Sequence, residues 1–415
     1  ASGDPIRSCI SWLDGRAVDE ARRIVRRMGG PHIFVAIVGG LPTGKDVLPK
    51  MLWLRRHEPD VFKGAAHLID CGSYLLWKAT GRIVVEWSVA SVTGLFNLKT
   101  KEWDKTLMRF FGLPPDLFPE LVQSTDRVGG LIPSAAADLG LPTGLPVFAG
   151  CGDGLAAPVG AGAVGEGDGH LTLGTSGFVG VITRRRLKGK RGIATLQSAD
   201  PEKLLLIGET ETAGVCLRWA AEQLFGEVSP GEAYRHMDEA VLANPPGARN
   251  LIFTPWMYGE RAPVADERLR ASFVNLGINH TRADMTRAIY EGVAYNLRWM
   301  LDSIRDLFGF PLESLRVIGG GAKSPVWCQI LADVTGRQLE IMPSPQEASA
   351  VGAGLLAAVG LGLYPSIESL RDLIQPDRII GPNPEAQGVY QRSYEVFRKI
   401  HKALRPVHHR MNTLP

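Results

Sequence analysis

The chain has 415 residues, of which 45% are hydrophobic and 21% charged, and its formal net charge at pH 7 is +3. A length of this order predicts about two to three domains, each with an apolar core. Because the net charge is small for the length, the composition predicts neither a nucleic-acid partner nor binding to an anionic membrane.

Cysteine usage and the absence of targeting patterns point to the cytoplasm. The five cysteines lie far apart and form no CxxC pair, which argues against a zinc site or a disulfide framework. We expect them to be small buried side chains. No basic region followed by an apolar core marks a signal peptide at the start. The longest uncharged stretch, residues 348–367, is rich in Gly and Ala and contains Pro365. It predicts a helix packed against a close neighbour rather than a membrane span.

Helical and strand patterns alternate along the chain, which is typical of the α/β class. An amphipathic helix is expected over residues 17–28, with its arginines on a solvated face. A short strand at 146–149 leads into the turn GCGDG and then into a helix of small residues. Two apolar runs, 170–173 and 178–183, are joined by the sequence GTSG and predict a hairpin. The basic segment 184–192 lacks interleaved aromatics and is expected to be a solvated loop.

The second half continues the alternation. Thr281 and Asp284 form a capping-box pattern before a long half-buried helix. A strand over 314–318 runs into a glycine triplet, after which Ser324 suits an N-cap and Pro325 a first helical position. The segment GEGDG, residues 165–169, separates an alanine-rich helix from the hairpin. It predicts two domains, residues 1–166 and 167–415.

Two glycine-rich turns are candidate phosphate sites. In GTSG, adjacent N–H groups and two hydroxyls could form a nest for phosphate oxygens, although an ordinary hairpin turn explains the same residues. The segment GGGAKS lies between a strand and a helix N-terminus, a position that suits a nucleotide phosphate or ribose. A tight connection between the two elements is the alternative. Ser324 stands where a dinucleotide-binding GxGxxG would need its third glycine, which argues against a nicotinamide dehydrogenase.

The carboxylates offer one candidate base. Asp153 follows a strand end between glycines, where it could accept the proton of a substrate hydroxyl during phosphoryl transfer. A turn aspartate that bonds its own backbone is the alternative. Asp14 and Arg16 in SWLDGR could pair with each other or line a pocket beside Trp12, and the ion pair is the simpler interpretation. No group of residues has the spacing of a metal site.

In their order along the chain, several segments together resemble the FGGY family of carbohydrate kinases. They include SWLDGR, LPKMLWLRRHEP, YLLWKATGR, GCGDGLAAPVGAG, LTLGTSG, WMYGERAP and IGGGAKSPVWCQILADVTGR. The resemblance extends along nearly the whole chain and is strongest to xylulokinase-like members. TGLFN together with GDG also looks like gluconate kinases.

This resemblance implies a two-lobed, actin-like (ribonuclease H-like) ATPase fold in which ATP and a sugar meet between the lobes. It implies ATP-dependent phosphorylation of a sugar, sugar acid or polyol, with Mg²⁺ as cofactor, in an enzyme that could be a homodimer. Asp153 would be the catalytic base, and Trp12 and Asp14 would contact the acceptor. The nucleotide-binding residues would be Gly174, Thr175 and Ser176 at the phosphates and Gly320, Gly321, Ala322 and Ser324 at the adenosine side.

The chain departs from the family pattern at its start. Members of the family begin with a strand hairpin carrying G-x-D-x-G-T, whose aspartate helps to hold Mg²⁺, and this sequence opens after that point. We therefore expect an incomplete first lobe, a further amino-terminal segment in the functional protein, and no assignable metal ligand in this chain. The missing aspartate keeps one alternative open: a nucleotide-binding, actin-like module without catalysis.

Overall fold

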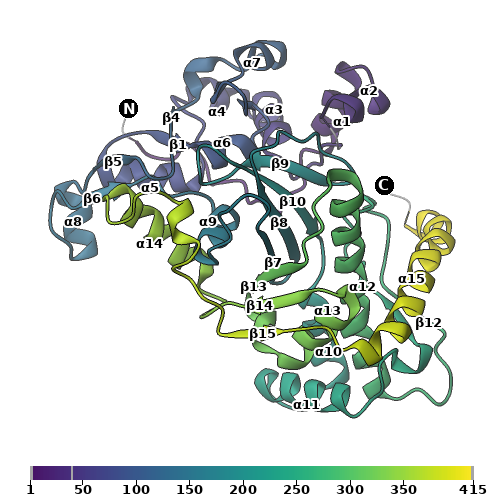
Figure 1. Ribbon diagram of the computed structural model, residues 1–415. Helices are drawn as coiled ribbons and strands as arrows, with labels where there is room; N and C mark the ends of the chain where they lie inside the picture. The colour runs from purple at the N-terminus through teal and green to yellow at the C-terminus, as the bar shows by residue number, and fades with distance from the viewer. Residues whose placement is uncertain (1–2, 39–40, 413–415) are drawn as a thin grey trace.

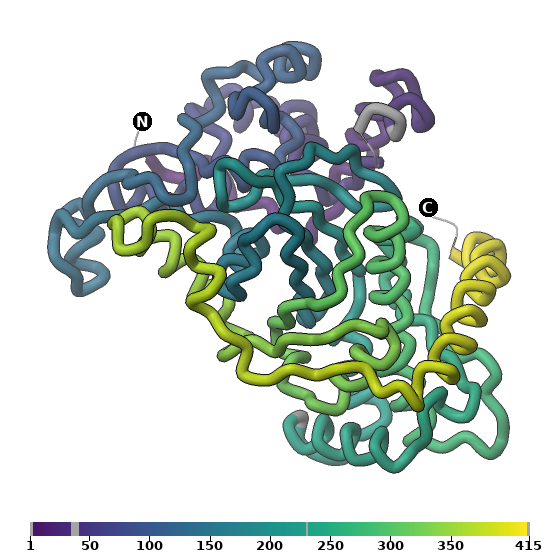
Figure 2. The backbone as a smooth tube through the Cα atoms, viewed as in Figure 1, coloured from purple at the N-terminus to yellow at the C-terminus, as the bar shows by residue number. Residues whose placement is uncertain are grey.

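The computed structural model describes residues 3–38 and 41–412. Its first part combines helices with short strands, and its second part is built on one large sheet (Figure 1). Figure 2 shows the chain passing from the first part, in purple and blue, to the second, in teal, green and yellow, with the yellow-green segment 348–360 returning beside the first part. None of the described helices is both long enough and apolar enough to cross a membrane.

The first part ends with the helix that begins at Asp153. Its elements are α1 (Val18–Arg27), α2 (Pro31–Val38), α3 (Val47–His57), α4 (Pro59–Gly64), α5 (Cys71–Thr80), β1 (Val84–Glu86), α6 (Trp87–Val92), β2 (Phe96–Asn97), β3 (Glu102–Trp103), α7 (Lys105–Phe111), β4 (Glu120–Val122), β5 (Arg127–Gly130), α8 (Pro133–Leu139), β6 (Pro146–Phe148) and α9 (Asp153–Gly160). Within the described residues these strands pair only in twos: β1 with β4, β2 with β3, and β5 with β6.

The second part contains the main sheet and the helices that cover it. Its elements are β7 (Gly169–Leu173), β8 (Gly177–Thr183), β9 (Ile193–Gln197), β10 (Leu204–Thr210), α10 (Gly214–Leu224), α11 (Pro230–Leu242), β11 (Ile252–Thr254), β12 (Ser272–Val274), α12 (Arg282–Phe308), β13 (Ser314–Ile318), α13 (Pro325–Thr335), β14 (Gln338–Ile341), α14 (Ala348–Gly360), β15 (Arg378–Ile380) and α15 (Pro384–Met411). Across the described sheet the strand order is β15-β14-β13-β7-β8-β10-β9.

The sheet joins a meander to a parallel unit. β7, β8, β10 and β9 pair antiparallel, whereas β13 runs parallel to both β7 and β14. The predicted hairpin is therefore confirmed, with GTSG as its turn. The capping box of Thr281 and Asp284 is also present and starts α12, which packs against β8 and β10. Most of α12 is buried because it lies inside the main hydrophobic core.

The two predicted small-residue helices, α9 and α14, pack against each other at backbone distance. A Cβ atom on Gly160 would lie 1.9 Å from the Ala348 carbonyl oxygen, and one on Gly352 would lie 2.0 Å from the Ala156 carbonyl oxygen. Such distances leave no room for any side chain, so the glycines permit the close approach. The sequence predicted a close neighbour for residues 348–367 without identifying it. In the structure that neighbour is α9.

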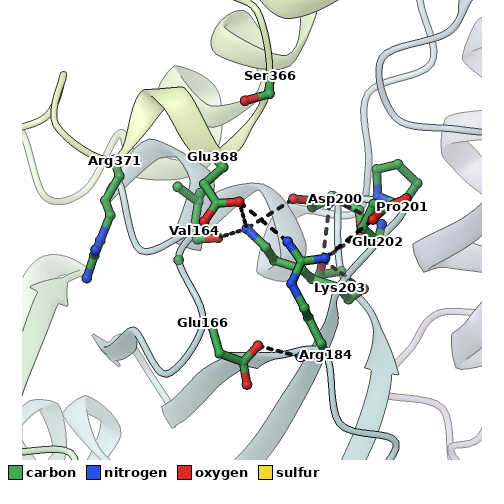
Figure 3. A network of polar contacts seen from close by, with 12 residues as sticks. Val164, Glu166, Arg184, Asp200, Pro201, Glu202, Lys203, Ser366, Glu368 and Arg371 are labelled. Carbon is green, nitrogen blue, oxygen red and sulfur yellow. Dashed lines mark hydrogen bonds and ion pairs between the residues drawn. The ribbon is translucent and has the colours of Figure 1, made fainter.

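A polar network fixes the chain that follows α9 (Figure 3). The Lys203 side chain is fully buried and donates to the Val164 carbonyl oxygen at 2.7 Å. Its Nζ also lies 3.0 Å from a Glu368 carboxylate oxygen, and this contact lowers the pKa of Glu368. Asp200 lies 3.3 Å from the same Nζ. The connection between α9 and β7 is thereby held to the β9–β10 turn and to the chain after α14.

The cysteines only partly follow the expectation from the sequence. Cys216 and Cys328 are buried, as predicted. The prediction is wrong for Cys9 and Cys71, which are exposed because both lie in surface segments of the first part. Their Sγ atoms are 3.7 Å apart.

Candidate active site

Three strands of the sheet end at one edge, and the segments that follow them are in contact there. β7, β13 and β14 are parallel, so their carboxyl ends lie at the same side. The Gly319 N–H, after β13, donates to the Pro345 carbonyl, after β14, at 2.6 Å. A Cβ on Gly319 would lie 2.6 Å from the carbonyl oxygen of Leu173, the last residue of β7. The two predicted nucleotide segments are therefore immediate neighbours.

The turn Gly174-Thr175-Ser176 is held from behind by the start of α10. The Gly174 carbonyl accepts from Gly214 N–H at 2.9 Å, and the Thr175 carbonyl accepts from the N–H groups of Ala213 and Val215. Within the described residues, the N–H groups of Thr175 and Ser176 donate no hydrogen bond. Thr175 is exposed. These two free donors and the Thr175 hydroxyl are the groups that can bind an anion there.

The glycine run after β13 forms one turn of 3₁₀ helix over Gly320–Lys323. Gly321 is required for packing, because a Cβ there would lie 2.3 Å from the Trp327 ring, and Ala322 is fully buried. Gly320 lies at the surface of this turn next to the Gln346 side chain. The backbone is thus the part of this segment that can face a ligand.

Ser324 caps α13 as predicted, since its Oγ accepts from Trp327 N–H at 3.0 Å. The same Oγ donates to the carboxylate of Asp238 in α11 at 2.9 Å, and Tyr290 Oη donates to that carboxylate at 2.8 Å. Burial raises the pKa of Asp238, and these two hydrogen bonds oppose the rise. Sequence reasoning missed Asp238, because nothing local in α11 distinguishes it from a solvated helix residue.

Asp153 is the first residue of α9 and is exposed. Its Oδ1 accepts from Gly154 N–H at 2.7 Å, and within the described residues Oδ2 has no hydrogen-bond partner. Ser349 Oγ, in the first turn of α14, donates to the Asp153 carbonyl at 3.0 Å. Since α14 follows the loop that contacts Gly319 and Gly320, Asp153 lies at the same edge as the two glycine segments.

Trp12 and Asp14 lie in the first part of the chain. The Trp12 side chain is 69% exposed. Asp14 forms an ion pair with Arg16 at 2.6 Å, and this contact lowers the pKa of Asp14. The ion pair expected from the sequence is therefore present. It leaves Trp12 as the more accessible of the two candidate acceptor contacts.

A charged cluster lies beside the GTSG turn and contains residues from both parts of the chain. Ser176 hydrogen-bonds Glu209 of β10, whose pKa is raised by burial. The Arg261 guanidinium contacts both Glu209 and Glu211. Lys45 reaches Glu211 from the first part, at 3.8 Å. The sequence pattern GERAP, which contains Arg261, was the signal that could have located this cluster.

The described residues contain no group of three or more His, Cys, Asp or Glu side chains that could hold a metal ion. Asp153 is one carboxylate with one free oxygen. Mg²⁺ requires octahedral oxygen coordination, so these residues do not form a metal site by themselves.

Comparison with known proteins identifies the family of this chain. Residues 1–160 match the N-terminal domain, and residues 169–361 the C-terminal domain, of the FGGY family of carbohydrate kinases. The chain belongs to this family. The predicted family and enzyme class are therefore confirmed: the protein is a carbohydrate kinase, a phosphotransferase that uses ATP as phosphate donor.

The similar proteins include both xylulose kinases and gluconokinases. The chain is 33% identical to a xylulose kinase of Staphylococcus epidermidis over 97% of this chain and 79% of the relative. It is 28% identical to a gluconokinase of Bacillus licheniformis over 96% of this chain and 79% of the relative. The crystal structure of a xylulose kinase from Rhodospirillum rubrum superposes with a TM-score of 0.87 at 29% identity, covering 97% of this chain and 81% of that one. A gluconate kinase from Lactobacillus acidophilus gives 0.86 at 26%, covering 96% and 80%.

These matches confirm the predicted mixed α/β, two-lobed actin-like fold. They also confirm a kinase acting on a small-molecule sugar or sugar acid, and they do not favour the alternative of a non-catalytic nucleotide-binding module.

Proposed function

We propose that Asp153 is the general base that accepts the proton of the acceptor hydroxyl, whose oxygen then attacks the γ-phosphorus of ATP. The observation that supports this role is the position of Asp153 at the edge where β7, β13 and β14 end, with Oδ2 unpartnered among the described residues. A carboxylate within hydrogen-bond reach of the hydroxyl is the geometry that general-base catalysis needs.

On this proposal the two glycine segments hold the nucleotide. The free N–H groups of Thr175 and Ser176 would donate to phosphate oxygens, with Gly174 forming the turn. The backbone of Gly320, Gly321 and Ala322 and the Ser324–Asp238 pair would face the adenosine side. Positioning and charge stabilisation of this kind supply most of the rate in phosphoryl transfer.

We propose that Mg²⁺ arrives bound to ATP. Mg²⁺ keeps several waters and is commonly held by substrate phosphates together with one or two carboxylates. Bound in this way it would neutralise phosphate charge. No residue of this chain is assigned to it.

The acceptor is proposed to be a ketopentose or an aldonate. Relatives named xylulose kinase and gluconokinase both cover nearly all of this chain, and this observation supports both acceptor classes. Trp12 and Asp14 are proposed to line the acceptor side, since Lys50 of α3 donates to the Ser11 and Trp12 carbonyls and so fixes their segment. Comparing kcat/KM across a panel of ketoses, aldonates and polyols would separate the two classes.

Asp153→Asn tests the base assignment. We expect kcat to fall by about 10²–10⁴-fold, the usual contribution of a positioned acid or base, with the Kd for ATP unchanged. Asp138→Asn on α8, which also removes an exposed carboxylate, is the control and should turn over normally. Undiminished turnover in Asp153→Asn would disprove the role.

The lobe boundary is proposed to lie between residues 166 and 167. It falls within the gap between the two family-model matches and within the segment held by Glu166, which accepts from Thr183 Oγ1 at 2.9 Å.

We further propose a cytoplasmic homodimer. Exposed leucines near α8 and at the end of α14, including Leu139, Leu141 and Leu363, are apolar surface that could support self-association. Analytical ultracentrifugation would test the dimer.

A further inference from the structure

An open groove of about 710 Å³ lies between α1 and α3, in the first part of the chain and away from the edge that carries Asp153. Ile24, Leu52 and Phe111 contribute its apolar lining. Its charged lining consists of one carboxylate and five guanidinium groups, which belong to Glu20 and to Arg23, Arg26, Arg27, Arg55 and Arg56. A volume of this size is within the range of small-molecule sites.

Three of the guanidinium groups are held in place by the protein. Arg55 donates to the Phe111 and Gly112 carbonyls. The Arg27 guanidinium stacks on Phe110 at 4.4 Å from the ring centre. Arg56 lies 3.7 Å from Glu20. Such anchoring orients donors before a ligand arrives and reduces the entropy lost on binding.

The part of the chain that the structure describes offers no ion-pair partner to the other two guanidinium groups. Within the described residues, neither the Arg23 nor the Arg26 side chain has a hydrogen bond or an ion pair, and both are exposed. Glu20, the one carboxylate of the groove, is 4% exposed and already lies near Arg56 and His57. The groove therefore carries an excess of positive charge that the protein does not balance.

Helix-end electrostatics explain only part of this arrangement. Arg26 and Arg27 lie in the last turn of α1, and Arg55 and Arg56 lie in the last turn of α3, positions where cations are favoured. That effect does not require the two ends to converge. In this structure the two helix ends converge. Burial, and after it the nearby Arg27 charge, lowers the pKa of Arg55, so the convergence disfavours the charged form of Arg55. A bound anion would remove this repulsion.

We propose that the α1–α3 groove is a binding site for a small anion that carries two or more phosphate groups, separate from the ATP site. Guanidinium groups approach the groove from two helices, so no single carboxylate with two oxygens can satisfy them. A phosphate offers three acceptor oxygens and a charge near −2, and Arg matches its geometry with paired N–H donors. A volume of about 710 Å³ matches a small molecule.

Calorimetric titration of the protein with inorganic triphosphate, with the nucleotide site filled by ADP, tests the proposal. We expect saturable binding in the wild type and binding at least tenfold weaker in the double variant Arg23→Ala/Arg26→Ala. Among the described residues these two side chains have no hydrogen-bond or ion-pair partner, so their loss should leave Tm and kinase turnover intact. Arg22→Ala is the matched control, because Arg22 lies on the same helix, pairs with Asp19 at 3.4 Å and does not line the groove.

Three results would overturn the proposal. They are no binding of triphosphate by the ADP-filled wild type, equal weakening by Arg22→Ala and the double variant, and binding of citrate but not of triphosphate. The test is independent of the proposed role of Asp153, since binding is measured without phosphoryl transfer.

Discussion

The contact between α9 and α14 makes Gly352 a sensitive position for activity. In Gly352→Ala the new Cβ would lie 2.0 Å from the Ala156 carbonyl oxygen, whereas ordinary van der Waals contact begins at 3.4 Å. The two helices must therefore separate locally by about 1.4 Å, since neither group is a flexible side chain. α9 begins at Asp153, so the displacement reaches the proposed base.

The expected magnitude follows from two opposing effects. Overpacking costs about 1–3 kcal/mol, and replacing a helical glycine by alanine returns about 1 kcal/mol, so stability should fall by about 0–2 kcal/mol. A misplacement near 1 Å at reacting groups costs about 10²-fold in rate. We expect kcat to fall by about that factor and Tm by a few degrees.

Steady-state kinetics and thermal unfolding of Gly352→Ala measure both effects, and Gly354→Ala is the control on the same helix. No atom lies within 4 Å of a Cβ built on Gly354, so that variant should keep kcat and gain slightly in stability. If Gly352→Ala kept wild-type kcat and Tm, the rigid coupling of α14 to Asp153 through α9 would be refuted.

Three further predictions concern other parts of the structure. Burial raises the pKa of Glu86 to about 7 from 4.5, so the folded protein holds a proton that the unfolded chain releases. Unfolding free energy should therefore fall by about 3 kcal/mol as pH rises through this range, and urea titrations of Glu86→Gln at several pH values should lack that decline. Cys9 and Cys71 should form a disulfide with oxidised glutathione, because their Sγ atoms lie 3.7 Å apart. Intact mass should then fall by two hydrogens, and a wild-type protein that keeps both thiols would contradict the expectation. Ser324→Ala should weaken ADP binding about tenfold in calorimetry, because the glycine turn loses its tie to α11. Ser229→Ala, which removes a helix cap elsewhere, should leave ADP binding unchanged.

The sequence was most informative where the structure is set by neighbouring residues. The hairpin around GTSG, the Ser324 cap and the capping box of Thr281 each rest on residues within a few positions of one another, and all three are present. The domain assignment and the roles of the site residues remain predictions. Family resemblance, rather than periodicity, indicated that Asp153 and the glycine turns belong together.

Contacts between distant residues could not be predicted. Asp238 contacts Ser324 from 86 positions away in the chain, and Cys9 contacts Cys71 across 62 positions. The arginines of α1 were expected to lie on a solvated face, which is correct for their exposure. Only the packing of α1 beside α3 reveals that they surround a groove with those of a second helix.

The parallel pairing of β7 with β13 also determines when ATP binding can arise during synthesis. His170 lies opposite Arg316, so the two strands can meet only after the whole meander, α10, α11 and α12 have left the ribosome. Until then one edge of β7 has unpaired N–H and C=O groups. Pairings this distant in sequence form slowly. A nascent chain that ends before Gly319 contains the complete GTSG turn but not the segment proposed for the adenosine side. On that proposal, nucleotide can stabilise this kinase only late in its translation.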